Sequence, residues 1–203
     1  MKYEIEATTS RIIHLLNRNG EESRDKAALS SLINAPTITS QRAQTIWPLL
    51  MADLDPKYLS HNGLPTRGEV AVYAGLRFYA IYQQGQTPFV YGQASGKAPE
   101  GVQFFTALSS LRQDEDTRKA LDVRVQNVLG ATTNIASVID GMNHLNSLLK
   151  GRNGTQKIDF ARLSQNLYRL QASYEQATQV RLLWGQQYFS AKSASTKNEG
   201  VQN

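Results

Sequence analysis

The sequence predicts an all-α protein in two parts, an N-terminal helical region packed on a C-terminal helical bundle. Apolar residues recur every three or four positions through most of the chain, which is the spacing that lines one face of a helix. No segment alternates long enough to require a strand, and the one strand-like run, PFVY at 88–91, cannot make a sheet alone. The segment 86–101 is rich in proline and glycine and marks a boundary. We therefore expect a helical region at 1–90, a bundle at 101–192 and a flexible tail at 193–203.

Four helices are expected in the N-terminal region. They are a helix over 8–19 ended by Gly20, one over 24–33 capped by Ser23, a third from Thr39 or Ser40, and a long one over 68–85. Pro48 should kink the third helix or begin it anew, because proline lacks a backbone donor. Turn-forming residues predict a loop over 55–65.

Short connections are expected between the helices of the C-terminal bundle. A short helix should run from Phe104 to near Arg112, and the acidic triplet 114–116 should begin the next, which Gly130 allows to break. Apolar residues then keep helical spacing from 135 to 149, where Gly151 closes the helix.

The stretch from Ile158 to Phe189 should complete the bundle. An apolar stripe of helical spacing is expected here from Leu163, Leu167, Leu170 and Tyr174. Asp159 precedes the stripe, where a carboxylate can accept hydrogen bonds from the first amides of a helix. At about 100° per residue, Arg162 and Arg169 project within about 20° of each other and well away from the leucines. One face of this helix therefore packs and another is basic.

Composition places the chain among ordinary globular proteins. Of its 203 residues, 40% are apolar and 19% are charged. Cysteine is absent, which excludes disulfides and thiolate metal sites and fits a reducing compartment. The first ten residues lack the apolar core of a secretory signal, and the longest apolar run, 46–52, is far shorter than a membrane span. We expect a soluble, cytoplasmic protein that does not contact a membrane.

Positive charge is concentrated in the C-terminal half. The net charge is +5, and residues 1–100 carry 10 Lys and Arg against 9 Asp and Glu, whereas residues 101–203 carry 12 against 8. Within 150–192, seven basic residues stand against two acidic ones. Such a local excess favours a polyanionic partner, because each contacted phosphate releases counterions. A basic surface that is merely solvated is the alternative.

No catalytic or metal-binding pattern is present in the sequence. His14, His61 and His144 lie on separate elements without a second ligand nearby; His144 is either a flank residue or able to reach a phosphate. The glycines of 151–157 lack phosphate-loop spacing, and the acidic triplet 114–116 fits helix capping better than calcium binding. No serine lies in a GxSxG elbow. We expect no enzyme activity, no metal and no cofactor.

Arginine and lysine on helix faces remain as the candidate functional residues. The predicted nucleic-acid-binding residues are Arg112, Arg118, Lys119, Arg124, Lys150, Arg162 and Arg169. Trp184, Tyr188 and Phe189 have core-like spacing, which favours packing over base stacking. Contact with the phosphate backbone is therefore the expected mode of binding.

An ordered set of motifs resembles a known family between Ser23 and Phe189. The motifs are AALSSLI at 27–33, IWPLL at 46–50, VAVYAGLRFYA at 70–80, ALSSLR at 107–112, NHLNSLLKG at 143–151, IDFARLSQNLYRLQ at 158–171 and VRLLWGQQYF at 180–189. In these motifs and their order, the chain resembles the CasB-type small subunit of the type I-E CRISPR surveillance complex, Cascade.

The resemblance implies an all-helical, two-part, non-enzymatic subunit that is present as a pair. Its implied partners are a second copy of itself, the backbone and large subunits of Cascade, the guide RNA and the target DNA. Its implied role is to stabilise the guide-paired and displaced DNA strands of the R-loop through basic residues on phosphates. The alternative is a helical adaptor that acts only through protein contacts, with an incidental basic surface.

The resemblance also carries individual residues. Arg112 and Arg124 stand where the family commonly has arginine. Ile33 and Asn34 replace a double arginine of the family, and Asn146 replaces another arginine, so these places are not expected to contact nucleic acid. Substitutes for these missing contacts are Arg24, Lys26 or Lys150.

Overall fold

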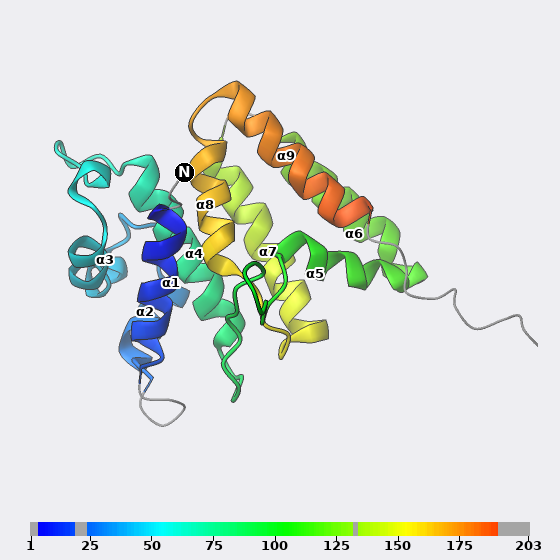
Figure 1. Cartoon of the computed structure of the whole chain (residues 1–203), viewed down its shortest axis with the longest axis horizontal. Coiled ribbons are helices and arrows are strands. Elements are labelled where there is room, and N and C mark those ends of the chain that lie inside the picture. The colour runs from blue at the N-terminus through cyan, green and yellow to red at the C-terminus, as the bar shows by residue number, and fades with distance from the viewer. Residues whose placement is uncertain (1–3, 19–23, 132–133, 191–203) are drawn as a thin grey trace, which may run out of the picture.

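The computed structural model describes residues 4–18, 24–131 and 134–190, and within them the chain is helical (Figure 1). The helices are α1 (Glu4–Leu16), α2 (Lys26–Asn34), α3 (Trp47–Asp53), α4 (Arg67–Gln83), α5 (Phe104–Ser110), α6 (Glu115–Gly130), α7 (Ile135–Asn153), α8 (Phe160–Leu170) and α9 (Tyr174–Phe189). Short 3-10 turns occupy Gln41–Thr45, Pro56–Tyr58 and Leu111–Gln113. The described part of the chain contains no β-strand; Ile158 forms isolated parallel bridges with Tyr91 and Val102. The all-α prediction is confirmed.

Helix α4 lies at the centre of the molecule. It contacts α1, α2, α7 and α8, and nearly every residue from Ala71 to Gln83 is buried. A capping box starts the helix: the Thr66 hydroxyl accepts from the Glu69 amide, and the Glu69 carboxylate accepts from the Thr66 amide at 2.7 Å. In Figure 1, α1, α2 and α3 lie on one side of α4, and α5, α6 and α9 lie on the other. The predicted long helix is thus wedged between others, as its wide apolar stripe indicates.

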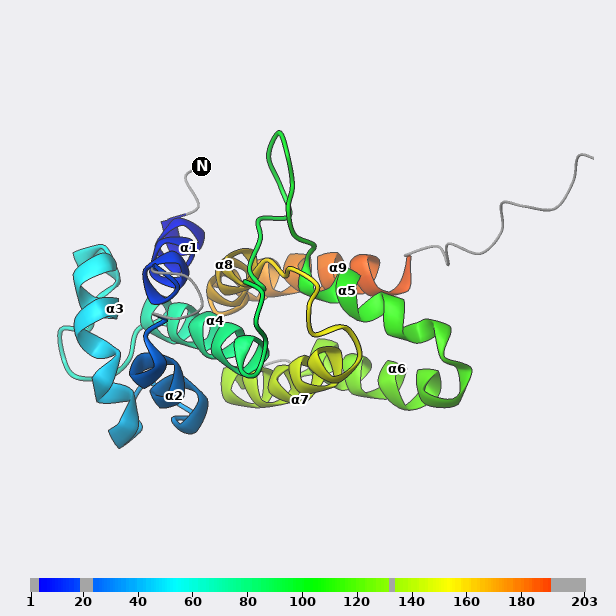
Figure 2. The ribbon, with the colours of Figure 1, turned by 90° about the horizontal axis from the view of Figure 1, so that it is seen from below.

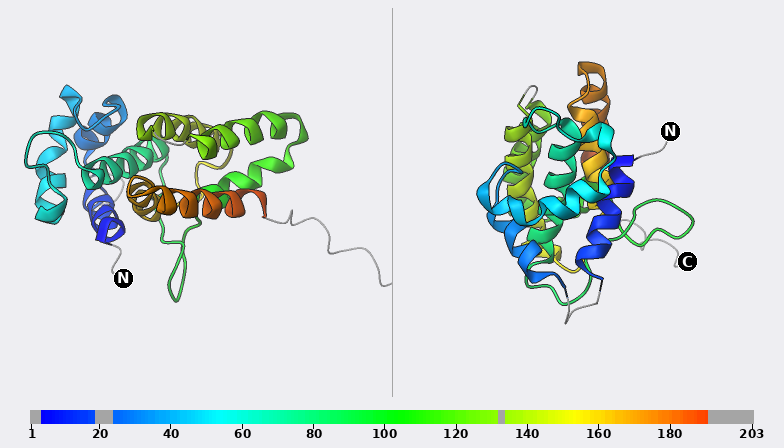
Figure 3. Two further views of the ribbon diagram at one scale, coloured as in Figure 1. Left: turned by 90° about the horizontal axis from the view of Figure 1, so that it is seen from above. Right: turned by 90° about the vertical axis from the view of Figure 1, so that its left-hand side faces the viewer.

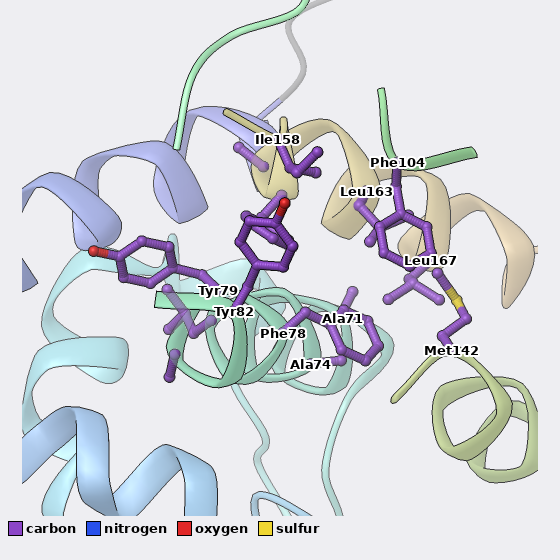
Figure 4. Packing of buried hydrophobic residues seen from close by; sticks show 14 of the residues in the cluster. Ala71, Ala74, Phe78, Tyr79, Tyr82, Phe104, Met142, Ile158, Leu163 and Leu167 are labelled. Atoms are coloured by element: carbon purple, nitrogen blue, oxygen red, sulfur yellow. The ribbon is translucent and has the colours of Figure 1, made fainter. Parts of the chain in front are cut away.

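Helix α8 joins the two sides of the fold. Helix α8 packs against α4, and its residues Leu163 and Leu167 are buried. In Figure 4, Ile158 lies over Tyr82 of α4, and Leu163 and Leu167 lie beside Phe104 and Met142. The helix also contacts α1 and α9. One cluster of buried apolar side chains therefore runs from α1 through α4 and α8 to α9. Division of the chain into an N-terminal helical region at 1–90 and a C-terminal bundle at 101–192 stays a prediction.

A loop between α4 and α5 projects from the body of the molecule (Figures 2 and 3). The 157–159 segment holds its base: the Ile158 amide donates to the Val90 carbonyl at 2.9 Å, and the Val102 amide donates to the Lys157 carbonyl at 3.0 Å. The Asp159 carboxylate accepts from the Ala94 amide at 2.8 Å. The proline- and glycine-rich segment 86–101 is therefore an irregular loop that is fastened to the start of α8.

Several helix ends in the N-terminal region differ from the sequence prediction. Helix α1 begins at Glu4, earlier than expected. Asp25, whose side chain accepts from the Ala28 amide at 2.9 Å, caps α2, and Ser23 lies outside the described residues. Pro48 stands in the first turn of α3, so the third predicted helix restarts there after a 3-10 turn. The predicted tail at 193–203 also lies outside the described residues.

Two predictions about where helices end in the C-terminal region are wrong, and each has a physical cause. Gly151 does not close α7, which continues to Asn153; contacts between its last turn and α4 outweigh the roughly 1 kcal/mol that an internal glycine costs. Tyr174 does not join the leucine stripe, because α8 ends at Leu170 and the Ser173 side chain caps a new helix. Tyr174 is 83% exposed there, since the apolar period does not continue across the turn.

Candidate nucleic-acid interface

Three of the predicted basic residues lie exposed on α6. Asp114 caps this helix by accepting from the Asp116 amide at 3.2 Å, as the acidic triplet predicts. Leu121, Val125 and Val128 form the buried stripe. At about 100° per residue, Arg118 and Arg124 lie on opposite flanks of this stripe, and Lys119 points to solvent. These three residues therefore present positive charge on more than one side of α6.

Arg112 belongs to a compact cluster between the end of α5, α6 and α9. Its Nε donates to Asp122 Oδ1 at 2.9 Å and its Nη2 donates to Oδ2 at 3.3 Å. The guanidinium also lies 5.2 Å from the ring centroids of Tyr188 and Phe189, and the Tyr188 hydroxyl donates to Asp122 Oδ1 at 2.7 Å. The Arg112 side chain is only 18% exposed. It fastens three helical elements together in the free protein.

The pKa values in this cluster follow from the same contacts. The hydrogen bond with Asp122 raises the pKa of Arg112. Burial acts to raise the pKa of Asp122, but the hydrogen bonds from Arg112 and Tyr188 outweigh it, and the pKa lies below its ordinary value of 3.8. Burial, reinforced by the hydrogen bond to Asp122, raises the pKa of Tyr188. At neutral pH the cluster therefore holds a charged pair and a neutral phenol.

A groove of about 570 Å³ lies between α6 and α7, and we name it the α6–α7 groove. Its walls consist of Arg124, Asn127, Val128 and Ala131 from the α6 side and Ser137, Gly141, His144, Ser147 and Leu148 from α7. Guanidinium, amide, hydroxyl and imidazole groups are the side chains that commonly donate hydrogen bonds to phosphate oxygens. The groove thus combines one exposed positive charge with several neutral donors.

Gly141 sets how closely the two helices of the groove approach. A Cβ atom at this position would lie 2.7 Å from Val128 Cγ2, which is closer than real contacts allow. The absence of a side chain at Gly141 therefore permits close packing beneath the groove floor. A larger residue would push α6 and α7 apart and change the shape of the groove.

The Lys150 side chain contacts the end of α4 within the same chain. Its ammonium donates to the Ile81 carbonyl at 2.8 Å and lies 3.5 Å from Gln84 Oε1. Ile81 is in the last turn of α4, where unpaired carbonyls and the negative end of the helix dipole attract a cation. Burial lowers the pKa of Lys150. This lysine joins α7 to the end of α4.

Arg162 and Arg169 project from α8 toward different neighbours. Arg162 Nη1 lies 3.0 Å from Glu6 Oε2 of α1, and both side chains are mostly buried. Burial raises the pKa of Glu6, although the charge of Arg162 acts against this shift. Arg169 Nη2 donates to Gln179 Oε1 of α9 at 3.0 Å. The two arginines help to hold α8 against α1 and α9.

The structure thus places Arg118, Lys119 and Arg124 on the surface of one helix. The other four predicted residues each contact another helical element of the same chain. The role of all seven in nucleic-acid binding stays a prediction. Arg24, one of the suggested substitutes, donates to the Asn17 side chain and to the Gln86 and Thr87 carbonyls, whereas Lys26 is exposed. Asn146 is fully buried and donates to the Phe78 carbonyl at 2.9 Å.

Most of the groove-lining residues were missed at the level of sequence, although a signal for them was present. Ser137, Gly141, His144 and Leu148 are spaced by four, three and four positions, so they share one face of α7. From the sequence, Lys150 is the predicted binding residue of this helix and His144 an open candidate, but the face shared by these four residues is not recognised. Faces of two helices make a groove only where the helices pack together, and this packing is a tertiary contact.

Histidine and acidic residues do not assemble into a metal site in the part of the chain that the structure describes. The His14 ring contacts Phe89 at a tilt and Tyr91 edge-on, with ring centroids 5.5 Å away in both pairs, so it is a rim residue of the core. His61 is exposed in a loop, and His144 Nδ1 lies 3.0 Å from the Asp140 carbonyl. Among the described helices, none has the length and apolar character needed to cross a membrane.

Comparisons with known proteins give a family and a fold. The family model described as CRISPR-associated protein Cse2 matches residues 25–189. The crystal structure of CasB from Thermobifida fusca resembles this structure with a TM-score of 0.67 at 17% sequence identity, covering 91% of this chain and 97% of that chain. A search of curated proteins finds no match. Because the family match spans most of the chain, the protein belongs to the CRISPR-associated protein Cse2 family of Cascade subunits.

Proposed function

We propose that this Cascade subunit is a non-enzymatic nucleic-acid-binding protein that stabilises the guide-paired and displaced DNA strands of the R-loop. Its contacts are with phosphates, and its partners are the backbone and large subunits of Cascade, the guide RNA, the target DNA and a second copy of itself. The α6–α7 groove and the adjoining exposed face of α6 are the proposed centre of this surface.

One observation carries the proposal. Lys119 and Arg124 are exposed, and within the described residues their side chains form no hydrogen bond or ion pair. Arg118 is 52% exposed and lies 3.9 Å from Asp122, which is at the limit of an ion pair. These cations are available to a polyanion, whereas Arg112, Lys150 and Arg162 already have partners. The neutral donors of the groove can add hydrogen bonds to the same phosphates.

The test measures binding to single- and double-stranded DNA by fluorescence anisotropy over a range of salt concentrations. The variant carries Arg118→Gln, Lys119→Gln and Arg124→Gln. We expect weaker binding and a shallower dependence on salt, by about 0.7 in log–log slope for each phosphate of a single strand that the variant no longer neutralises. Arg112 and Arg162 are left intact, because their removal would disturb folding as well as charge.

A matched control removes the same charge elsewhere. Arg18, Arg42 and Lys97 are exposed and lie in the N-terminal region or the projecting loop, away from α6. The triple glutamine variant at these positions loses the same net charge, but it should bind nearly as the unchanged chain does because these residues lie outside the proposed surface. Equal loss of binding in both variants would contradict a localised binding surface.

The adaptor function remains the second candidate, and one observation favours it. Four of the seven predicted residues, Arg112, Lys150, Arg162 and Arg169, hold helices of this chain together. An adaptor would show no salt-sensitive DNA binding but would still assemble with tagged neighbouring subunits.

Incubation of the purified chain with DNA and a divalent metal should leave the DNA intact; cleavage would contradict the non-enzymatic assignment.

A further inference from the structure

A second cavity, of about 360 Å³, lies on the opposite side of α7 from the α6–α7 groove, between α4, α7 and the 36–39 segment. Its walls are mainly apolar and include Ile38, Val70, Ile135 and Ile139. We name it the Arg77 cavity, because Arg77 of α4 contributes the guanidinium in its wall. A mostly apolar cavity with a few polar groups is the form that binding sites for organic groups commonly take.

Two side chains of the Arg77 cavity have buried polar atoms without hydrogen-bond partners. Arg77 Nε and Nη1 are shielded from solvent and donate no hydrogen bond. Oδ1 of Asn143, from α7, is likewise shielded and accepts none. Burial lowers the pKa of Arg77, as expected for a desolvated cation. Unpaired buried donors and acceptors are rare in folded proteins and costly, so each calls for an explanation.

The unpaired groups complement a peptide group. A peptide carbonyl can accept from the Arg77 guanidinium, and the neighbouring amide can donate to Asn143 Oδ1. Arg77 and Asn143 are each partly exposed, whereas their unpaired atoms are shielded in the free chain. A segment that enters the cavity therefore pairs with these atoms once the two side chains turn toward it. The apolar walls accommodate a side chain from the same segment.

Nucleic acid fits the same cavity poorly. A phosphate has no proton to donate to Asn143 Oδ1, and the carboxylate of Asp140 lines the cavity and repels anions. The charges of Arg77 and Asp140 nearly cancel.

A neighbouring cavity extends the site. It has a volume of about 380 Å³, is lined by Trp47, Met51 and Leu59, and shares Ile38, Thr39 and Pro65 with the Arg77 cavity. Met51 is 42% exposed although it is apolar. Together the two cavities can take up an extended segment several residues long.

We propose that the Arg77 cavity binds an extended peptide segment of another protein, which pairs its backbone with Arg77 and Asn143 and inserts an apolar side chain between α4 and α7. The inference rests on the proposed function only in its choice of protein partners, the neighbouring Cascade subunits. One side of α7 then binds protein, and the other side binds nucleic acid.

Site-specific cross-linking tests the proposal in the assembled complex. The chain has no cysteine, so Thr39→Cys provides a single thiol at the wall that both cavities share. A benzophenone attached there should cross-link to a protein subunit when the chain is assembled with its neighbouring Cascade subunits, guide RNA and target DNA. The same label at Asn127→Cys, in the α6–α7 groove, should cross-link to DNA.

The two labels separate failure of this inference from failure of the proposed function. If the Thr39→Cys label joins only nucleic acid, or nothing, while the Asn127→Cys label joins DNA, the peptide-binding inference is wrong and the proposed function stands. If the Thr39→Cys label joins protein while the Asn127→Cys label does not join DNA, the inference stands and the proposed nucleic-acid surface is wrong.

Arg77→Met tests the role of the guanidinium. Methionine keeps the apolar stem but removes the unpaired donors, so the free chain should unfold at the same temperature or higher. Protein cross-linking from the Thr39→Cys label should fall about tenfold, since a charge-assisted hydrogen bond is removed. Asn143→Leu should reduce it in the same direction, whereas Arg42→Met, at an exposed position outside both cavities, should not. Unchanged cross-linking in Arg77→Met, or a lower unfolding temperature, would overturn the proposal.

Discussion

Asp122 accepts hydrogen bonds from Arg112 and Tyr188, which come from different helical elements. At the scale of single residues, this carboxylate determines what Arg112 can do. A guanidinium with two hydrogen bonds to one carboxylate and two aromatic rings at 5.2 Å is largely desolvated. Its first contribution is therefore to stability, and removal of either partner leaves a charge without its counterpart.

Asp122→Asn should destabilise the protein at about pH 7 by about 1–3 kcal/mol, because charged hydrogen bonds become neutral ones. The folded pKa of Asp122 lies below its ordinary value of 3.8, so the stabilisation is present above that value and is lost as pH falls through the folded pKa. Urea unfolding of both proteins should therefore show a smaller difference at about pH 3 than at about pH 7. An equal difference at both pH values would show that the carboxylate charge is unimportant.

Asp159 joins the projecting loop to α8 through one side chain. It is 1% exposed, and its two oxygens accept from the Ala94 amide and the Arg162 amide at 2.8 Å and 2.9 Å. Burial outweighs these hydrogen bonds and raises the pKa of the carboxyl group. The same residue is thus a helix cap and a clamp for a loop 65 positions away.

Asp159→Ala should cost about 1–3 kcal/mol, since it removes a cap and leaves buried amides unpaired. Hydrogen exchange should accelerate at the Ala94 and Arg162 amides more than at the start of α9, where Ser173 caps independently. Unchanged protection at Ala94 would mean that the backbone bridges to 157–159 suffice to hold the loop.

At the scale of elements, α4 and α8 approach closely where Gly75 faces Ser164. A Cβ at Gly75 would lie 1.7 Å from Ser164 Oγ and 3.1 Å from the Phe160 carbonyl oxygen. Neither the backbone nor Ser164 can yield without moving α8, because Ser164 is fully buried and its hydroxyl donates to the Phe160 carbonyl. Glycine at this position permits the central packing contact of the fold.

Gly75→Ala should destabilise the protein by about 1–3 kcal/mol, as overpacking of a core does. Ser164→Ala in the same chain should recover part of this stability, because the closest clashing atom is gone. Gly151→Ala is the matched control: it lies in α7 with no atom within 4 Å of its added Cβ and should stabilise by about 0.5–1 kcal/mol. Thermal or urea unfolding of the four proteins measures these effects; a neutral Gly75→Ala would contradict the packing described.

For the whole molecule, the continuity of the core decides how the chain unfolds. Helix α8 belongs to the C-terminal part of the sequence but packs on α1 and α4. A single cluster of buried side chains therefore joins residues that precede the loop over 86–101 to residues that follow it. Removing α8 would expose the apolar faces of both N-terminal helices.

The full chain should therefore unfold in one cooperative transition, with equal midpoints by near-ultraviolet and far-ultraviolet circular dichroism. A fragment of residues 1–90 alone should lack a cooperative transition, because α8 is needed to cover α1 and α4. Two separate transitions in the full chain, or cooperative unfolding of the fragment, would show that 1–90 and 101–192 are independent domains.

Local patterns in the sequence were enough to predict much of the secondary structure. Apolar spacing predicted the helices, the Asp114 and Asp159 caps follow from carboxylates standing just before periodic runs, and the restart at Pro48 follows from its missing donor. The prediction failed at Gly151 and Tyr174, where contacts between helices, or a new cap, determined the helix end. Local signals act over a turn or two of helix and carry no information on which helices meet.

The proposed binding surface depends on which helices pack together. By itself the sequence determined an all-helical chain, its family and an excess of basic residues in the C-terminal half. Only the tertiary structure decided which of these residues are available: Arg162 is paired with Glu6, 156 positions away, and Lys150 with the Ile81 carbonyl, 69 positions away, whereas Lys119 and Arg124 stay exposed. The reason is physical, because a cation is no longer available to phosphate when packing brings an acceptor to it, and packing partners lie far apart along the chain.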